Sequence, residues 1–275
     1  MTDIRLICLD MDGTLLDDDH ATVPARNVRA LRAAAERGAA VAIASGRSWG
    51  LLREVADQVG AVRYAVLSNG AAVLDVRAGQ WLYRNCLAEE RWRGLVRILL
   101  EERLPFEVYC EGETYIQADR FQSVLDCALS PQFRGVLRRH TVLPENLEDA
   151  LAGRAVEKLH IYRIPEARRA AVTERLLSCG PLTAASAFPG NLEFTAPGVH
   201  KGAAVQALCA RMGWSAEQVM AFGDAGNDLE LLSWAGWSFA MANATEQARA
   251  TARYVTGSNT EAGVAMAVER YFLDS

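Results

Sequence analysis

The stretch Leu6-Ile7-Cys8-Leu9-Asp10-Met11-Asp12-Gly13-Thr14 begins as an apolar run and ends in two carboxylates and a glycine. A short apolar run of this kind is typical of a β-strand that is buried on both faces of a parallel sheet. Ligands of open α/β sheets bind beyond the carboxyl ends of the strands, so Asp10 and Asp12 stand where a site is expected. One carboxylate can attack an electrophile while the other handles a proton, and a hard cation would relieve their mutual repulsion.

Strand-like and helix-like segments alternate in the blocks at both ends of the chain. Short apolar runs that end at polar residues predict strands, and helical spacing of apolar residues predicts helices. The predicted strands are 6–9, 39–44, 64–67, 219–222, 238–241 and 252–255, and the predicted helices are 24–38, 49–59, 202–212, 228–234 and 245–249. This alternation predicts an α/β fold with a Rossmann-like parallel sheet.

The middle of the chain has a different pattern. Hairpins are predicted from 71–83 and from 106–117, helices at 89–102 and 166–178, and strands at 158–163, 183–187 and 191–195, with a long irregular stretch to about Glu145. These elements are typical of an α+β domain. We therefore predict a catalytic core of residues 1–82 and 189–275, and an inserted α+β cap domain of residues 83–188 that sets substrate specificity.

Composition and charge narrow the possible classes of partner. The 275 residues carry a net charge of −5, and the basic residues are dispersed, so no nucleic-acid surface is expected. The N-terminus lacks signal-peptide features and no segment has the length of an apolar membrane helix, so no membrane association is expected. Six scattered cysteines without a CxxC pair fit reduced thiols in a cytoplasmic protein. The four histidines show no metal-ligand spacing, and 17–19 is expected to be a solvated acidic loop.

Three further strand ends carry side chains or backbone groups that suit an anion or a metal ion. Gly223-Asp224-Ala225-Gly226-Asn227-Asp228 brings three oxygen-bearing side chains to one predicted strand tip, where oxygen ligands suit Mg²⁺. Ser45-Gly46-Arg47 offers a hydroxyl and free backbone N–H groups at the start of a helix. Lys201 supplies a cation at another strand-to-helix junction. Each segment alone also fits a plain turn or a helix cap.

Taken together, these motifs resemble the haloacid dehalogenase superfamily of phosphohydrolases. Within it, the chain resembles the Cof-type branch, in which a large α/β cap is inserted between the second and third motifs. The matching segments are Leu9-Asp10-Met11-Asp12-Gly13-Thr14-Leu15-Leu16, Ala44-Ser45-Gly46-Arg47, Ser68-Asn69-Gly70-Ala71, Gly198-Val199-His200-Lys201-Gly202 and Phe222-Gly223-Asp224-Ala225-Gly226-Asn227-Asp228.

The resemblance implies a Mg²⁺-dependent phosphatase that hydrolyses small phosphorylated metabolites, such as sugar phosphates, through an aspartyl-phosphate. Asp10 would be the nucleophile, Asp12 the general acid and base, and Lys201 a further catalytic residue. Mg²⁺ would be held by Asp10, the backbone carbonyl of Asp12, Asp224 and Asp228. The phosphate ester would be contacted by residues of all five segments, namely Met11, Thr14, Ser45, Gly46, Arg47, Asn69, Lys201 and Asn227. The protein would be a monomer or a weak homodimer.

Two other functions use the same phosphorylated aspartate. A phosphomutase would return the phosphoryl group to a sugar instead of to water. A receiver-like module would accept a phosphoryl group without being an enzyme, but it has no need of an acid and base such as Asp12, and a receiver of 100–150 residues leaves no room for so large an insertion. A metabolite-binding protein that has lost its activity is disfavoured, because every motif residue is present.

Overall fold

The structure is a computed structural model that describes residues 3–128, 130–186 and 190–274. The chain divides into two compact units. We call residues 1–47, 52–83 and 200–275 the core unit, and residues 48–51 and 84–199 the inserted unit. Each unit has its own sheet and its own hydrophobic core.

The core unit is built on an eight-stranded sheet of order β14-β13-β12-β1-β2-β3-β4-β5. The strands from β14 to β3 run parallel, and β4 is antiparallel to β3. The strands are β1 (Leu6–Leu9), β2 (Ala40–Ala44), β3 (Val62–Leu67), β4 (Ala72–Asp75), β5 (Gln80–Arg84), β12 (Val219–Gly223), β13 (Trp237–Ala240) and β14 (Tyr254–Val255). The predicted α/β class with a parallel-rich sheet is confirmed.

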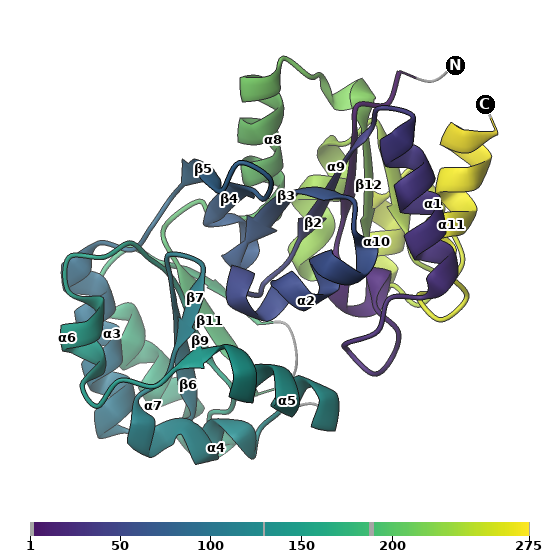
Figure 1. Ribbon diagram of the computed structural model, residues 1–275. Helices are drawn as coiled ribbons and strands as arrows, with labels where there is room; N and C mark the ends of the chain where they lie inside the picture. Colours follow the sequence, from purple (N-terminus) through teal and green to yellow (C-terminus); the bar gives the residue numbers. More distant parts are fainter. Residues whose placement is uncertain (1–2, 129, 187–189, 275) are drawn as a thin grey trace. The chain divides into compact units, whose positions relative to one another are not determined.

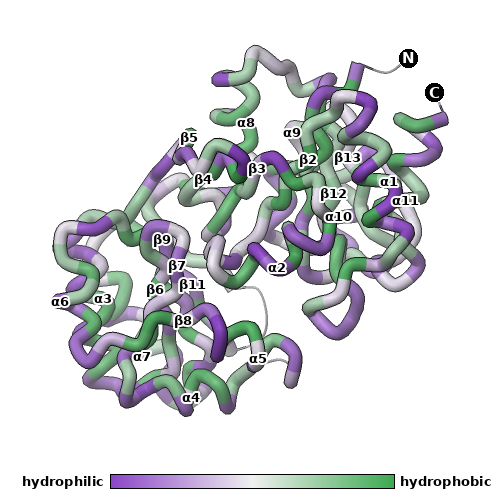
Figure 2. The backbone as a smooth tube through the Cα atoms, viewed as in Figure 1, coloured by the Kyte–Doolittle hydropathy of each residue, from purple (hydrophilic) through white to green (hydrophobic). Residues whose placement is uncertain are grey.

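Helices cover this sheet because its central strands are apolar on both faces. Alternate strand residues such as Leu6, Cys8 and Ala221 pack with Val205 and Leu208 of α8 in one hydrophobic cluster. Helices α8 and α9 lie side by side, and so do α1 and α11 (Figure 1). Hydrophobic and hydrophilic residues alternate along α1, as expected of a helix that buries one side (Figure 2). The helices are α1 (Ala25–Glu36), α2 (Trp49–Val59), α8 (Lys201–Met212), α9 (Leu229–Trp234), α10 (Glu246–Thr251) and α11 (Gly263–Val268).

The inserted unit has a six-stranded sheet of order β10-β11-β9-β6-β7-β8, antiparallel except for the β7–β8 pair. The strands are β6 (Phe106–Cys110), β7 (Glu113–Tyr115), β8 (Thr141–Val142), β9 (Val156–Ile161), β10 (Thr183–Ala185) and β11 (Leu192–Thr195). The helices are α3 (Glu89–Glu101), α4 (Phe121–Leu125), α5 (Pro131–His140), α6 (Leu147–Leu151) and α7 (Glu166–Leu177). Helices α3 and α7 lie side by side (Figure 1).

One face of the inserted sheet is apolar and the other carries charged groups. Phe106, Leu159 and Phe194 pack with α3 and α7 in a single hydrophobic cluster. On the other face, Lys158 donates from Nζ to Glu193 Oε1 at 3.0 Å, and the Lys158 side chain is 1% exposed. The inserted unit therefore contains a buried ion pair of its own.

Two expectations for the inserted unit differ from the structure. The stretch between 118 and 142, expected to be irregular, contains α4, α5 and β8, because Val124, Phe133 and Leu137 form an apolar cluster that the short segments bury together. The expected boundary between 188 and 189 falls outside the described residues. The observed division lies between Val199 and His200, since β11 pairs with β9 and belongs to the inserted sheet.

Two findings bear on the expected environment of the chain. No helix among the described residues is long and apolar enough to cross a membrane. All six cysteines are free.

Candidate functional site

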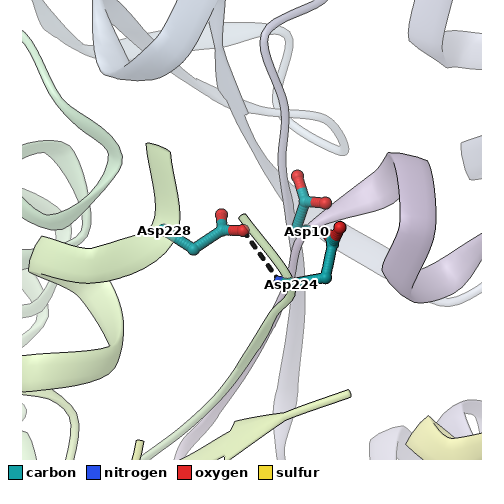
Figure 3. A group of neighbouring side chains, drawn as sticks. All are labelled: Asp10, Asp224 and Asp228. Atoms are coloured by element: carbon teal, nitrogen blue, oxygen red, sulfur yellow. Dashed lines mark hydrogen bonds between the residues drawn. The ribbon is translucent and has the colours of Figure 1, made fainter. Parts of the chain in front are cut away.

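Asp10, Asp224 and Asp228 bring three carboxylates together in the core unit. Asp10 follows β1, Asp224 follows β12, and Asp228 ends the short turn η5 (Gly226–Asp228) before α9. One oxygen of each carboxylate lies within 4.8 Å of the others (Figure 3). β1 and β12 are neighbouring parallel strands, so their carboxyl ends meet at the same edge of the sheet.

Lys201, the first residue of α8, lies between two of these carboxylates. Its Nζ donates to Asp10 Oδ1 and, at 2.6 Å, to Asp228 Oδ1. Its side chain is fully buried. Burial by itself would lower the pKa of Lys201, but the charges of Asp10 and Asp228 outweigh it and raise that pKa. Lys201 is therefore a fixed cation of the cluster.

Asp228 also orders the loop that carries Asp224. Its Oδ2 accepts the backbone N–H of Asp224 at 3.0 Å and that of Ala225 at 3.1 Å, and the first of these bonds is drawn in Figure 3. Asp224 in turn accepts a hydrogen bond on Oδ1 from the Thr14 hydroxyl at 3.0 Å. Because Lys201 and two backbone groups already occupy both oxygens of Asp228, its geometry suits support of the site more than direct ligation.

The charge of the cluster suits a divalent cation. When its three carboxylates are ionised and Lys201 is protonated, the cluster has a net charge of −2. Burial, followed by the charge of Asp228, raises the pKa of Asp224 to about 6 and holds the pKa of Asp10 well above its usual range. Burial is the largest cause of both raised pKa values, and the neighbouring negative charge of Asp228 adds to it. The hard carboxylate oxygens are the ligands that Mg²⁺ prefers, so the residues fit this ion.

Two glycines allow these segments to approach each other closely. Gly13 has φ +83°, and a Cβ there would lie 2.5 Å from Asp224 Oδ2. Gly70 has φ +103°, and a Cβ there would overlap the carbonyl of His200, next to Lys201. Only glycine combines such φ values with such contacts. The turns after β1 and β3 thus set the positions of Asp224 and Lys201.

Asp12 is paired with Arg47. The guanidinium donates from Nη2 to Asp12 Oδ1 at 2.5 Å and from Nε to Oδ2 at 3.1 Å. Burial alone would raise the pKa of Asp12, but Arg47 and His20 together lower it to about 2. The Asp12 side chain lies outside the group of three carboxylates, and ligation through its backbone carbonyl remains a prediction. Arg47, expected at the phosphate, has the Asp12 carboxylate as its partner.

The remaining predicted residues take varied positions near the strand ends. Ser45 is buried, and its Oγ accepts the backbone N–H of Arg47 at 3.2 Å. Asn69 donates its backbone N–H to the Ser45 carbonyl at 3.1 Å, so the loops after β2 and β3 are bonded together. Gly46 and Asn227 are partly exposed. The Met11 side chain is fully buried.

Nearly the whole chain matches one family of known proteins. The sequence profile of the haloacid dehalogenase-like hydrolases matches residues 7–268. The chain belongs to the haloacid dehalogenase-like hydrolases. The predicted family is thereby confirmed, and the carboxylate cluster of this hydrolase lies in the part of the chain that the profile covers.

Several relatives of this hydrolase are named as phosphatases. A 5-amino-6-(5-phospho-D-ribitylamino)uracil phosphatase of Bacillus subtilis is 28% identical, covering 98% of this chain and 97% of its own. An Escherichia coli phosphatase of the same name is 26% identical, covering 97% and 96%. The crystal structure of a haloacid dehalogenase-like hydrolase from Bacteroides thetaiotaomicron has a TM-score of 0.83 at 26% identity, covering 98% and 100%. The predicted enzyme class, a phosphoric monoester hydrolase, is confirmed at the level of the family.

Before the family resemblance is considered, residue types and spacing give Lys201 little weight and His20 none. Of the 29 basic residues only two, Lys158 and Lys201, are lysines, and both are buried in ion pairs. Lysine is rarely fully buried unless it is paired, so this scarcity is a usable signal for Lys201. His20 reads as an ordinary histidine in the sequence, yet its Nδ1 lies 3.0 Å from Asp12 Oδ1. The segment between Asp12 and His20 has no predicted helix or strand that would bring the two side chains together, so the sequence holds no signal for it.

Proposed function

We propose that the protein is a Mg²⁺-dependent phosphatase of small phosphorylated metabolites, which works through an aspartyl-phosphate on Asp10. The observation that carries this proposal is the buried Lys201 ammonium bonded to Asp10, beside Asp224 and Asp228. Such a cluster offers a nucleophile of fixed orientation, a fixed cation and a place for a divalent ion. Phosphoryl transfer needs this combination of positioning and charge neutralisation.

In the first half-reaction, Asp10 attacks phosphorus and the bond to the leaving alkoxide breaks. Asp12 gives a proton to that alkoxide, which requires that the negative charge of the bound phosphate ester raise the pKa of Asp12 from its value of about 2 in the free protein. Lys201 keeps the Asp10 carboxylate in a single orientation, and Ser45 and Asn227 are the proposed donors to the phosphoryl oxygens. Asp10, the Asp12 carbonyl and Asp224 would hold Mg²⁺, which when bound would supply positive charge to balance the phosphoryl oxygens.

In the second half-reaction, Asp12 takes a proton from water while the water oxygen attacks phosphorus. The bond between phosphorus and Asp10 breaks, which releases inorganic phosphate and restores the Asp10 carboxylate. The pairing of Asp12 with Arg47 supports its role as a base, since it favours the ionised carboxylate.

The relatives support a first choice of substrate. Two of them are named for an ester whose phosphate sits on a ribityl chain. We propose a small phosphorylated sugar or sugar alcohol as the substrate class, and a cytoplasmic location that the free cysteines support. A panel of sugar phosphates, phosphoribityl esters, nucleotides and cofactor phosphates should reveal a preference within this class.

The decisive test is capture of the phosphoenzyme. Asp12→Asn should release p-nitrophenol once per enzyme and then stall, because this leaving group hardly needs a proton whereas the attacking water needs a base. Mass spectrometry should then find one phosphoryl group on the peptide that contains Asp10. Asp10→Asn should give neither the burst nor the adduct. Steady release of inorganic phosphate by Asp10→Asn would overturn the mechanism, and isomerisation of a sugar phosphate without phosphate release would indicate a mutase.

A further inference from the structure

The loop of residues 17–22 is a hydrogen-bonded turn that presents His20. Asp17 donates its backbone N–H to the Thr22 carbonyl at 2.9 Å. The backbone N–H of His20 donates to the Asp17 carbonyl at 3.1 Å. Asp19 Oδ1 accepts the backbone N–H groups of Ala21 and Thr22 at 2.9 and 2.8 Å. The acidic residues lie in a partly exposed loop, as expected, and the Asp19 side chain folds this loop on itself.

Contacts with the rest of the core unit fix this loop in place. Gln58 of α2 donates to the Ala21 carbonyl at 2.8 Å and accepts the Val23 N–H at 3.0 Å. Asn259 donates to Asp18 Oδ1 at 3.1 Å. His20 has φ +58°, a left-handed conformation that is uncommon for residues other than glycine, although histidine adopts it more often than most. Such a conformation persists where the surroundings hold it, as these bonds do.

His20 forms a closed set of contacts with Asp12 and Arg47. Its Nδ1–H donates to Asp12 Oδ1 at 3.0 Å, since an ionised carboxylate only accepts. Arg47 Nη2 donates to that same oxygen at 2.5 Å and to the His20 carbonyl at 3.1 Å. The three residues thus join the turn after β1, the loop after β2 and the loop of residues 17–22.

We propose that His20 is a positioning residue, which holds the Asp12 carboxylate in the orientation that proton transfer requires. This inference rests on the proposed function, in which Asp12 gives a proton to the leaving oxygen and takes one from water. Arg47 alone would fix the Asp12 carboxylate only relative to the end of the long Arg47 side chain. The imidazole, carried by a loop bonded to α2 and to Asn259, fixes the pair to the core unit.

Proton transfer by Asp12 requires that its carboxylate be held in one orientation. The Asp12 side chain is 38% exposed and stands on a turn, so packing does little to fix its rotamer. Small misplacement of a catalytic group can cost up to about 100-fold in rate. Loss of the His20 contact should therefore slow the step in which Asp12 protonates a poor leaving group, by more than the higher pKa of Asp12 without His20 would speed it. It should change little where the leaving group needs no proton.

The test compares two aryl esters of nearly equal shape. The value of kcat/KM covers only the steps through release of the first product, so it reports on leaving-group protonation. His20→Gly tolerates the left-handed φ but offers no donor. It should lower kcat/KM for phenyl phosphate by about 10-fold or more, while kcat/KM for p-nitrophenyl phosphate changes little.

Matched variants separate positioning from folding. His20→Asn keeps the backbone preference and places an N–H near the position of Nδ1, so it should restore most of the phenyl phosphate activity. His20→Asp has the same shape without an N–H, so it should behave like His20→Gly or worse, and it keeps the test decisive if His20→Gly fails to fold. Thr22→Val removes only the 2.5 Å bond from the Thr22 hydroxyl to Asp19 Oδ2 and should keep the parent ratio of the two kcat/KM values.

The outcomes distinguish failure of this inference from failure of the proposed function. A parent enzyme that hydrolyses neither ester with Mg²⁺ would overturn the proposed function. If the parent is active but His20→Gly keeps its ratio of kcat/KM values, or loses activity equally on both esters, His20 is not a positioning residue. Equal behaviour of His20→Asn and His20→Asp would also contradict the role of the Nδ1–H bond.

Discussion

The ammonium of Lys201 donates to the carboxylate of Asp10 although 191 positions separate the two residues in the chain. The two arrive there because α8 begins at Lys201 while β1 ends just before Asp10. The contact fixes the orientation of the proposed nucleophile. Lys201 is also the only lysine among the described residues of the site. Its loss leaves the Asp10 and Asp228 carboxylates buried without their shared cation.

Replacement of Lys201 by methionine should abolish phosphatase activity and lower the free energy of unfolding. Removing one partner of a buried ion pair typically costs about 3–5 kcal/mol, because the other charge stays buried. Urea denaturation and p-nitrophenyl phosphate hydrolysis measure the two effects.

Lys158→Met is the matched control, since it breaks a buried pair of the inserted unit, that with Glu193. It should lower stability as well but keep measurable hydrolysis of p-nitrophenyl phosphate. Equal residual activity of the two variants would show that Lys201 is not a catalytic residue.

Activity should depend on Mg²⁺, disappear with EDTA and be inhibited by Ca²⁺. Ca²⁺ takes more oxygen ligands at longer distances and would hold Asp10 in the wrong place. Hydrolysis of p-nitrophenyl phosphate after dialysis, with each ion added back, provides the measurement. Asp224→Asn should need far more Mg²⁺ for half-maximal activity. Undiminished activity in EDTA would contradict the proposed metal site.

The stabilisation of the protein by Mg²⁺ should grow as the pH rises from about 5 to 7. The pKa of Asp224 is raised to about 6, so below this pH a proton occupies the carboxylate that the ion needs. A raised pKa gives the metal-free protein stability that is present below the unfolded-state value of 3.8 and lost as the pH rises through about 6.

Melting temperatures at several pH values, with and without Mg²⁺, test the predicted direction of this pH dependence. Without Mg²⁺ the melting temperature should fall across this range, and at 100 times the Kd the ion should add about 2.7 kcal/mol once the carboxylates are ionised. Asp12, with its pKa lowered to about 2, stays ionised throughout and adds no slope. A Mg²⁺ effect that is largest at pH 5 would contradict the assignment of Asp224.

Gly70→Ala should reduce both stability and activity by displacing the start of α8. A methyl group there would meet the carbonyl of His200, and φ is +103°. Gly38→Ala is the control, because Gly38 has a similar φ of +95° but nothing within 4 Å of the added carbon. Gly38→Ala should cost about 1 kcal/mol from backbone strain alone and leave kcat unchanged. Equal kinetic effects of the two variants would argue against close packing at Gly70 as the cause.

The inserted unit should act as a cap that sets substrate specificity. If residues 84–199 are replaced by a short Gly/Ser linker, the core unit keeps its carboxylate cluster and should still bind Mg²⁺. Discrimination among sugar phosphates should collapse, whereas hydrolysis of p-nitrophenyl phosphate should fall less. A shortened chain that ranks the substrate panel as the parent does would place specificity in the core loops instead.

The α/β class, most of the strands and the carboxylates at the strand ends could be predicted from local sequence patterns. These features follow from local periodicity and from the rule that parallel strands present their carboxyl ends at one edge. The common site of Asp10 and Asp224 was expected from the family resemblance, because periodicity does not reveal that β1 and β12 are neighbours. Short segments such as α4 and α5 were not predictable, because they are stabilised mainly by burying Val124 and Phe133 in a shared cluster.

The contacts between individual side chains could not be predicted in this way, because they depend on how distant segments pack. The bond from Lys201 to Asp10 depends on how closely α8 approaches the turn at Gly70, and that from His20 to Asp12 depends on a left-handed residue in a folded loop. The boundary at Val199 depends on the pairing of β11 with β9. Periodicity encodes which face of an element is buried, whereas these contacts arise from backbone conformations and packing between segments distant in the chain, which no local pattern records.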